Sequence, residues 1–326
     1  MIDFVQYGVF NRPARCEIGF FLPDTFAMLP FIAALEPLRA ANRFSQEPLY
    51  RWHLFGETSE PAIANNAMTQ NVIGALEMAD KLNRLIVCGP HDPHHYDFTK
   101  SVPVLKRLAQ SGTALGALDT GSYLLAEADL IRDKRCTVHW EVLPGFREAY
   151  PTLDVSSELF EADDDLFTCA GGAAALDMMI AIIAKDHGRK LATQVAELFV
   201  HTDVRSANEP QRMGIAERTG VYHPGLISCI ELMESNIEQP LNATELASMV
   251  GLSSRQLERL FRAHLDVTPT LYYQQLRLRR GHDLLRQTPM SVLEVSAAVG
   301  FTSADYFARR FRALFGCSPT DARFRQ

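Results

Sequence analysis

Residues 245–254 read ELASMVGLSS, and residues 294–303 repeat the pattern as EVSAAVGFTS. The turn glycines of the two copies, Gly251 and Gly300, lie 49 positions apart. In each copy a short helical pattern runs into a glycine turn, and a second helical pattern follows. Two units of this kind fit adjacent major-groove segments of one DNA duplex. The repeat therefore predicts DNA binding.

The length and the composition are those of a globular protein with two domains. Of 326 residues, 47% are hydrophobic and 22% are charged. The first fifteen residues lack the apolar stretch of a signal peptide, and the other apolar runs are too short to cross a bilayer. The six cysteines form no Cys-x-x-Cys pair, which favours reduced thiols over disulfides or zinc. We therefore expect a cytoplasmic protein without a membrane partner, a metal or a cofactor.

The net charge of −7 is divided unevenly along the chain. Residues 222–326 contain 12 Lys and Arg against 10 Asp and Glu, a net charge of +2, whereas residues 1–221 carry −9. The excess acid thus belongs to the first half, which is compatible with DNA binding by the second. A charge of only +2 argues against a non-specific, purely electrostatic nucleic-acid binder.

Strand-like and helix-like patterns alternate through the first half of the chain. Such βαβ alternation predicts a flavodoxin-like α/β domain, in which a mainly parallel sheet carries helices on both faces. The expected strands are 17–22, 51–55, 85–88, 114–118 and 166–169, and the expected helices are 26–44, 102–109 and 173–185.

A polar segment separates this half from a purely helical one. Residues 203–221 contain Pro210, Gly214 and Gly220 and show no apolar period, so we place a linker there. The predicted domains are 1–202, which is α/β, and 222–326, which is all-α with two helix-turn-helix motifs. Seven helices are expected in the second domain, as two triads joined by one long helix from about residue 269 to 286.

The second helix of each repeat has one apolar and one polar face. Leu257, Leu260 and Phe261 share one side of the first, and Phe307, Phe311 and Leu314 share one side of the second. Ser253 or Ser254, and Thr302 or Ser303, are the candidate N-caps. The polar faces carry Arg255, Glu258, Arg259 and Arg262 in the first helix and Asp305, Arg309 and Arg312 in the second.

These polar faces suit DNA chemically. Arginine can bond guanine edges in bidentate fashion, and an acidic residue can accept from cytosine. Arg262 and Arg312, one turn beyond the helix starts, are the expected phosphate contacts. Alternatively the faces are merely solvated, which explains one helix but not two copies with the same turn, caps and basic face.

Residues 222–326 resemble the DNA-binding domain of the AraC/XylS family of bacterial transcription regulators. The resemblance rests on GLSS at 251–254, Leu257, Phe261 and Pro269, and on AAVGFTS at 297–303 with the Phe311-Arg, Phe315-Gly and Ser318-Pro pairs that follow. It implies that one chain reads two major-groove sites. The base-contacting positions that it implies are Arg255, Glu258, Arg259, Ala304, Asp305, Tyr306 and Arg309. Ala304 offers only a methyl group, so we expect the second helix to specify less.

Residues 113–126, TALGALDTGSYLLA, describe an apolar strand that turns sharply into a helix. This pattern resembles a nucleophile elbow. Together with TVHW at 137–140 and TCAGGAAALD at 168–177, it makes residues 16–188 similar to the PfpI/class I glutamine-amidotransferase-like domain. This domain ahead of an AraC-type domain defines a subgroup of regulators, and the resemblance implies that such regulators sense amino acids or quaternary ammonium compounds and activate catabolic genes.

The sequence departs from the enzymes of that family at the nucleophile. Asp119 stands where they place cysteine, and a carboxylate cannot perform thiolate chemistry. Their acidic partner on the first helix is absent, with Pro30 near that position, and Cys169 lacks an obvious base. We therefore expect no catalysis. The alternative is an amidase, hydratase or protease of the PfpI type with a DNA-binding tail.

The former active-site cleft is the expected effector site, because ligands of open α/β sheets bind beyond the carboxyl ends of the strands. At a helix N-terminus Asp119 should be ionised and could pair with a cation, with aromatic faces nearby for an ammonium group. Alternatively Asp119 only caps its helix, the aromatic residues are core and Glu36 is an exposed helix residue. The candidate contacts are Asp119, Thr120, His139, Trp140, Phe26, Tyr123 and Glu36.

A histidine-rich segment, HDPHHYD at 91–97, suggests a metal site at first sight. Its prolines and loop context favour a surface turn instead.

The combined interpretation is a cytoplasmic bacterial transcription regulator, expected to be an activator, that responds to a small nitrogenous metabolite. The effector would favour an arrangement or a homodimer that engages promoter DNA and RNA polymerase.

Overall fold

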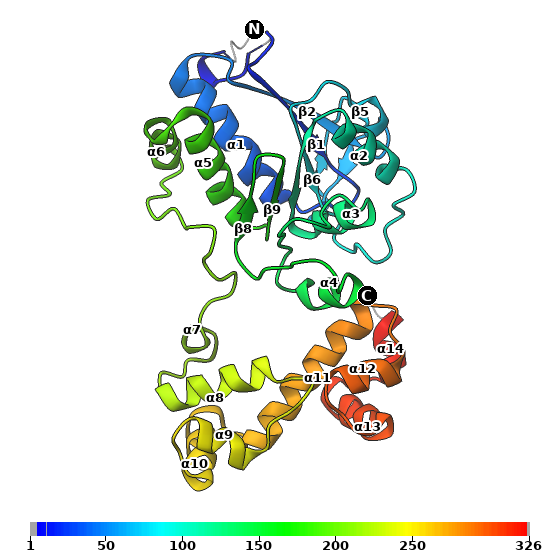
Figure 1. Cartoon of the computed structure of the whole chain (residues 1–326), viewed down its shortest axis with the longest axis vertical. Coiled ribbons are helices and arrows are strands. Elements are labelled where there is room, and N and C mark those ends of the chain that lie inside the picture. The colour runs from blue at the N-terminus through cyan, green and yellow to red at the C-terminus, as the bar shows by residue number, and fades with distance from the viewer. Residues whose placement is uncertain (1–4, 11, 325–326) are drawn as a thin grey trace. The chain divides into compact units, whose positions relative to one another are not determined.

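The computed structural model describes residues 5–10 and 12–324, which divide into two compact units, Met1–Gln211 and Arg212–Gln326 (Figure 1). The segment predicted as a linker is shared between them. Residues 203–211 belong to the first unit, and residues 212–221 belong to the second and include a short helix, α7 (Ile215–Thr219). Ile215 and Val221 are buried in an apolar core of the second unit.

The first unit is built on a seven-stranded sheet with strand order β5-β2-β1-β6-β7-β9-β8. All of its ladders are parallel except that between β8 and β9. The five predicted strands are confirmed, and they form the centre of the sheet in the flavodoxin-like order. The strands are β1 (Cys16–Phe21), β2 (Tyr50–Gly56), β5 (Gly74–Ala75), β6 (Arg84–Cys88), β7 (Ala114–Leu118), β8 (Phe160–Ala162) and β9 (Leu166–Cys169), while β3 (Ala62–Ile63) and β4 (Thr69–Gln70) form a separate antiparallel pair.

Helices cover both faces of this sheet, as predicted (Figure 1). Successive residues of a strand point to opposite faces, so Phe20 and Phe21 of β1 enter two different apolar cores. Phe20 packs in the core that contains residues of α1 (Met28–Ser45), α5 (Ala174–His187) and α6 (Arg189–Leu198). The other core contains residues of α2 (Ser101–Gln110), α3 (Ser122–Glu127) and α4 (Leu143–Ala149).

A buried carboxylate fastens the end of the first unit to α5. Asp177 is fully buried, and its carboxylate accepts hydrogen bonds from Arg205 Nη2 at 2.6 Å and Nε at 3.0 Å and contacts His201 Nε2 at 2.6 Å. The Arg205 backbone N–H also donates to it at 3.0 Å. Burying a carboxylate is tolerated because these partners replace water.

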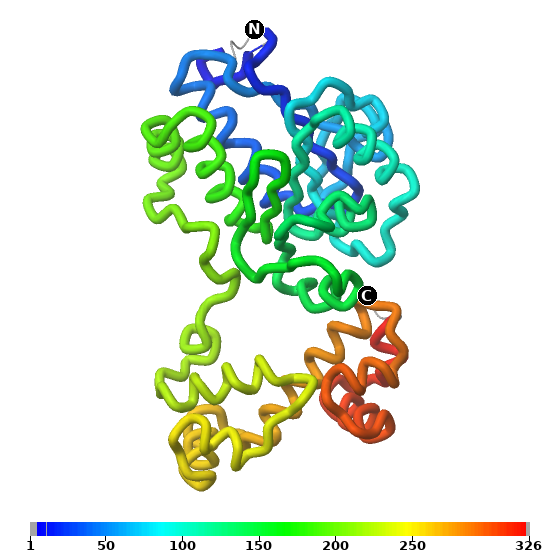
Figure 2. The backbone as a smooth tube through the Cα atoms, viewed as in Figure 1, coloured from blue at the N-terminus to red at the C-terminus, as the bar shows by residue number. Residues whose placement is uncertain are grey.

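The second unit is helical, and the predicted arrangement of seven helices is confirmed for residues 222–324. The long helix α11 (Pro269–Gln287) lies between two triads, as the chain trace in Figure 2 shows. Tyr273 of α11 packs in the core of the first triad, and Leu278 and Leu285 pack in that of the second. The triads are α8 (Pro224–Ser235), α9 (Ala243–Met249) and α10 (Ser254–Leu265), then α12 (Val292–Ala298), α13 (Ala304–Phe315) and α14 (Pro319–Phe324). Among the described residues, no helix is long and apolar enough to cross a membrane.

Replacing Asp177 with alanine should destabilise the first unit by about 2 kcal/mol, because Arg205 and His201 would lose their buried acceptor. Both tryptophans, Trp52 and Trp140, lie in the first unit, so urea unfolding followed by tryptophan fluorescence reports on this unit. Asp164→Ala is the control, since Asp164 pairs with Lys185 at an exposed position. The control should cost less than about 0.5 kcal/mol. Equal effects of the two substitutions would refute the anchoring role of Asp177.

Candidate DNA-binding surface and effector site

The first helix-turn-helix is formed by α9 and α10. Gly251 occupies the turn at φ +68°, a left-handed conformation that suits glycine. Ser253 is the N-cap of α10: its hydroxyl accepts from the Gln256 N–H at 3.3 Å, and the Gln256 side chain accepts from the Ser253 N–H at 2.8 Å. This reciprocal capping box fixes where the second helix of the motif begins.

The second helix-turn-helix is formed by α12 and α13. Gly300 lies at φ +71°, and a Cβ atom there would come within 2.6 Å of the carbonyl oxygen of Glu238, so the turn requires glycine. Ser303 caps α13, its hydroxyl accepting from the Tyr306 N–H at 3.3 Å. Of the caps that the sequence left open, the structure selects Ser253 and Ser303.

Both second helices bury their apolar face and expose the predicted polar one. Leu257, Phe261, Phe307 and Phe311 are fully buried. On the opposite faces Ala304 is half-buried, and the other predicted DNA contacts are exposed: Arg255, Glu258, Arg259, Arg262, Asp305, Tyr306, Arg309 and Arg312. Within the described ranges, no ion pair occupies any of the arginines in this set. Their guanidinium groups therefore remain available for phosphates and base edges.

Gln274 of α11 positions the exposed face of α13, which the sequence did not reveal. Its Nε2 donates to the Tyr306 hydroxyl at 2.9 Å, and its Oε1 accepts from Arg310 Nε at 2.7 Å. The Arg309 guanidinium lies 5.8 Å from the Tyr306 ring centroid. The two Gln274 hydrogen bonds join residues 32 and 36 positions apart, a separation at which no local sequence pattern signals a contact.

One basic residue of the helical unit has a structural role. Arg277 of α11 donates to the carbonyl oxygens of Val299 at 2.8 Å and Gly300 at 2.7 Å, and its guanidinium lies 4.2 Å from the Phe301 ring centroid. It thereby satisfies the carbonyl groups of the second turn, which α12 leaves unpaired. Arg277 is thus a positioning residue for the second motif.

The turn after β7 has the predicted elbow geometry. Asp119 lies at φ +61°, an unusual conformation for a residue other than glycine, and it begins the 3-10 turn η3 (Asp119–Gly121) that leads into α3. Two glycines, Gly171 and Gly89, lie in close contact with this turn. A Cβ atom on Gly171 would lie 2.9 Å from Asp119 Cβ, and one on Gly89 would lie 2.1 Å from the Gly121 nitrogen. The carboxylate therefore stands on a tightly packed, strained turn at the carboxyl edge of the sheet.

The electrostatic surroundings of Asp119 act in both directions on its carboxyl group. Burial raises the pKa of its carboxyl group above the ordinary value, and Glu141 raises it further, whereas His139 and His91 lower it. The sequence had predicted that a helix N-terminus would keep the group ionised. The helix that follows has only six residues, and burial of the carboxyl group acts against the effect of its N-terminus.

The structure brings only part of the predicted effector set to Asp119. His139 lies against it, its N–H donating to the Asp119 carbonyl oxygen at 3.3 Å, and Trp140 is 38% exposed beside His139. Other predicted contacts are used elsewhere: Thr120 is buried and donates to the Pro90 carbonyl at 2.5 Å, Phe26 and Tyr123 are buried among aromatic neighbours, and Glu36 accepts three hydrogen bonds from Arg39.

The thiols next to the elbow are poorly suited to nucleophilic catalysis. Cys169 is fully buried, and burial raises its pKa to about 12. Burial and the Asp119 carboxylate also raise the pKa of Cys88. Both groups are therefore held as thiols rather than thiolates at neutral pH.

The histidine-rich segment follows β6 as a loop. His94 packs on the Tyr123 ring with centroids 5.0 Å apart, and His95 pairs with Asp92 at 2.8 Å. Across residues 5–10 and 12–324, no three His, Cys, Asp or Glu side chains form a group that could hold a metal ion.

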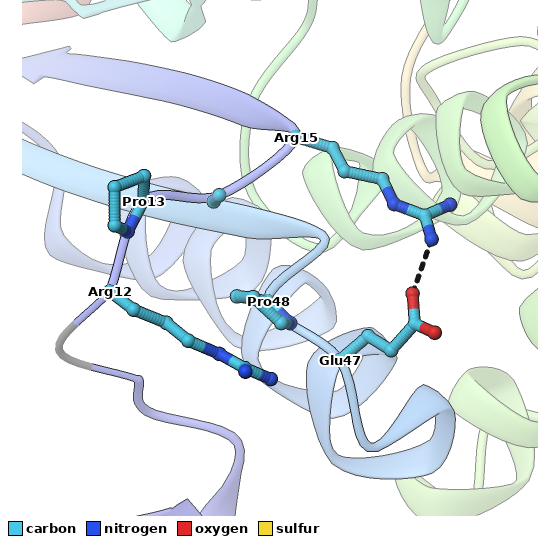
Figure 3. A pocket seen from close by; sticks show the side chains of 6 residues that line it. Arg12, Pro13, Arg15, Glu47 and Pro48 are labelled. Atoms are coloured by element: carbon cyan, nitrogen blue, oxygen red, sulfur yellow. Dashed lines mark hydrogen bonds and ion pairs between the residues drawn. The ribbon is translucent and has the colours of Figure 1, made fainter.

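A cavity of about 450 Å³ lies at the opposite edge of the sheet (Figure 3). Arg12, Pro13 and Arg15 line it on the approach to β1, and Glu47 and Pro48 line it on the approach to β2. Arg15 and Glu47 form an ion pair across it. Because β1 and β2 begin here, this cavity is remote from the carboxyl ends of the strands, where Asp119 stands.

Comparison with known proteins places the chain in a family. A family model described as a helix-turn-helix domain matches residues 246–325. The HTH-type transcriptional regulators CdhR and GbdR of Pseudomonas aeruginosa are 45% and 38% identical to this chain over 307 residues. These matches cover 94% of this chain and 91% and 84% of those proteins. The regulator ArgR of the same organism is 38% identical over 314 residues, or 96% of this chain and 93% of ArgR.

The chain belongs to the AraC family of helix-turn-helix transcription regulators, in the group with a PfpI-like α/β domain at the N-terminus. A solved AraC family transcriptional regulator from Pseudomonas putida shares its fold, with a TM-score of 0.52 at 22% identity, over 57% of this chain and all of that chain. Both resemblances drawn from the sequence are confirmed, and the helix-turn-helix unit is a DNA-binding domain.

The two kinds of predicted DNA contact can be told apart by substitution. Arg259→Ala should weaken binding to a preferred duplex, selected from a random library, by about 5- to 150-fold and relax its sequence preference, because a base contact is lost. Arg262→Ala should weaken binding to preferred and random duplexes alike, because a phosphate contact is lost. The slope of log affinity against log salt concentration should decrease in magnitude by about one. Lys190→Ala, on the exposed side of α6, is the control that removes one positive charge outside the DNA-binding unit. It should change neither the DNA affinity nor its salt dependence. If Arg259→Ala behaves as the control does, α10 does not read bases through this residue.

Proposed function

We propose that this regulator activates transcription when its α/β domain binds a small nitrogenous metabolite at the Asp119 elbow. The observation that carries the proposal is a carboxylate, in place of a thiolate, on a strained turn at the carboxyl edge of the sheet. Burial raises the pKa of Asp119, and a cationic nitrogen beside it would lower that pKa again, because an opposite charge favours the ionised carboxylate. The partly exposed Trp140, next to His139, offers an aromatic face for the same cation.

The proposed response is a change in how the helix-turn-helix unit engages promoter DNA and RNA polymerase. By the resemblance to other regulators, the acting form is a homodimer. Size-exclusion chromatography with and without promoter DNA tests this part, and a monomer at micromolar concentration in both samples would contradict it. We expect the purified protein to turn over no amide, since neither Asp119 nor the buried Cys169 provides a thiolate.

A chain of hydrogen bonds supports a route from the elbow to the end of the first unit. The His139 N–H donates to the Asp119 carbonyl oxygen, and the two residues before His139 accept hydrogen bonds from the Gln211 side chain. Gln211 Nε2 donates to Val138 O at 3.0 Å, Thr137 Oγ1 at 2.9 Å and Glu158 O at 2.9 Å. Gln211 is the last residue of this unit, so a displacement of residues 137–139 by an effector would reach the start of the DNA-binding unit.

Asp119→Asn should abolish the response to the effector and leave basal DNA affinity unchanged. Asparagine tolerates the positive φ of this position, so the elbow keeps its shape while the charge is lost. The effector is first identified by a thermal-shift screen of amino acids and methylated amines, because a ligand that binds only the native state raises the melting temperature. Reporter induction and DNA affinity are then measured for both proteins, and full induction of the variant would reject the site.

Gln211→Ala should separate binding from response. The variant is expected to bind the effector and promoter DNA with affinities within about twofold of the parent, while reporter induction falls at least fivefold, a coupling loss of about 1 kcal/mol. The matched control is Gln110→Ala, at the exposed end of α2, which should induce normally. Normal induction by Gln211→Ala would rule out this route.

A further inference from the structure

A second cavity, of about 200 Å³, lies at the carboxyl edge of the sheet but away from Asp119. Phe21, the last residue of β1, forms part of its wall, and Glu57 and Thr58 contribute from the segment that follows β2. The segment after β6 supplies Tyr96 and the buried Ser101. Asp119, in contrast, follows β7 and does not line this cavity.

The topology of the sheet explains why a cavity forms here. β1 and β6 are neighbours, but the chain leaves them in opposite directions: β1 continues to β2 on one side, and β6 continues to β7 on the other. The connecting helices α1 and α2 pack in the cores on opposite faces of the sheet. In open α/β sheets such a topological switch point leaves a crevice outside the carboxyl ends of the two strands, and ligands bind there.

The lining combines an aromatic wall with an excess of negative charge. Phe21 is buried and the Tyr96 ring is half-buried. The cavity is lined by three acidic residues, Glu57, Glu77 and Asp97, together with one lysine, Lys100, and one histidine, His95. The Tyr96 ring packs on Phe98 with centroids 5.2 Å apart, and its hydroxyl lies near the side chains of Glu57 and Ser101. We propose that this switch-point cavity binds a small organic cation, independently of Asp119, through carboxylate pairing and contact with the aromatic wall.

The volume limits the size of that cation. A cavity of about 150 Å³ holds a molecule as large as benzene. A volume of 200 Å³ therefore suits a ligand of about six to ten non-hydrogen atoms and is too small for a nucleotide. Choline, putrescine and agmatine fall within this range and serve as probes. The neutral compound 3,3-dimethyl-1-butanol has the shape of choline without its charge and serves as the ligand control.

Isothermal titration calorimetry of the full chain with the three probes, without DNA, tests the proposal. At least one cation should bind with a Kd below about 5 mM, and the neutral analogue should not bind. Glu57→Gln and Asp97→Asn should each weaken that binding about tenfold, since each removes one charge from the lining. Glu60→Gln, on the same loop but outside the cavity, should leave the affinity within about twofold.

Several outcomes would overturn the proposal: no binding of any probe at 10 mM, equal binding of the neutral analogue, or an affinity indifferent to Glu57→Gln and Asp97→Asn. Loss of binding in Asp119→Asn would assign the cation to the elbow instead. This inference does not rest on the proposed function. Reporter induction of the Asp119→Asn variant tests the elbow site, whereas DNA-free calorimetry of the Glu57→Gln variant tests the cavity. The proposed function and this inference can therefore fail separately.

Discussion

Helix α11 belongs to two apolar cores at once, and the DNA-binding unit depends on this. Tyr273 near its start packs with Leu257 and Phe261 beneath α10, and Leu278 and Leu285 pack with Phe307 and Phe311 beneath α13. A helix of 19 residues is about 28 Å long, close to the roughly 34 Å that separates successive turns of the major groove. Since both recognition helices rest on one continuous helix, their spacing is set by a rigid element rather than by a loop.

The α/β unit preserves the geometry of an enzyme elbow without the group that would make it reactive. The turn remains strained at Asp119, and Gly89 and Gly171 still give it room. Strain of this kind is stable only where the surrounding packing imposes it. The scaffold is thus suited to presenting one side chain at the edge of the sheet, and here the side chain is a partly buried carboxylate whose charge state responds to its neighbours.

Much of the architecture was predictable because long, strongly patterned segments determine it. The five central strands, the helices on both faces and the seven helices of the second unit follow from apolar periods and glycine turns. The two-residue strand β5, the three-residue strand β8 and helix α7 escaped prediction, because so few residues carry no period. Two residues of the polar segment 203–221, Ile215 and Val221, are buried in a core. The residues around them in sequence show no apolar period that would predict this burial.

The sites were predictable to a lesser degree, for a physical reason. Exposure on a helix follows from its period, so the polar faces around Arg259 and Arg309 could be assigned from sequence. The surroundings of Asp119 depend on contacts between distant segments, so Phe26 and Thr120, placed in the cleft by sequence, are instead buried in packing. The same holds for Gln274 and for the cavity beside Tyr96, since each joins parts of the chain that only the fold brings together.

The central claim, that one chain places α10 and α13 in successive turns of the major groove, is tested most directly by guanine methylation interference on duplexes selected by the full protein. Methylation at N7 blocks arginine contacts in the major groove. The account predicts two interfering clusters on one face of the duplex, with centres about 10–10.5 base pairs apart. A single cluster, or interference spread evenly over the duplex, would contradict it.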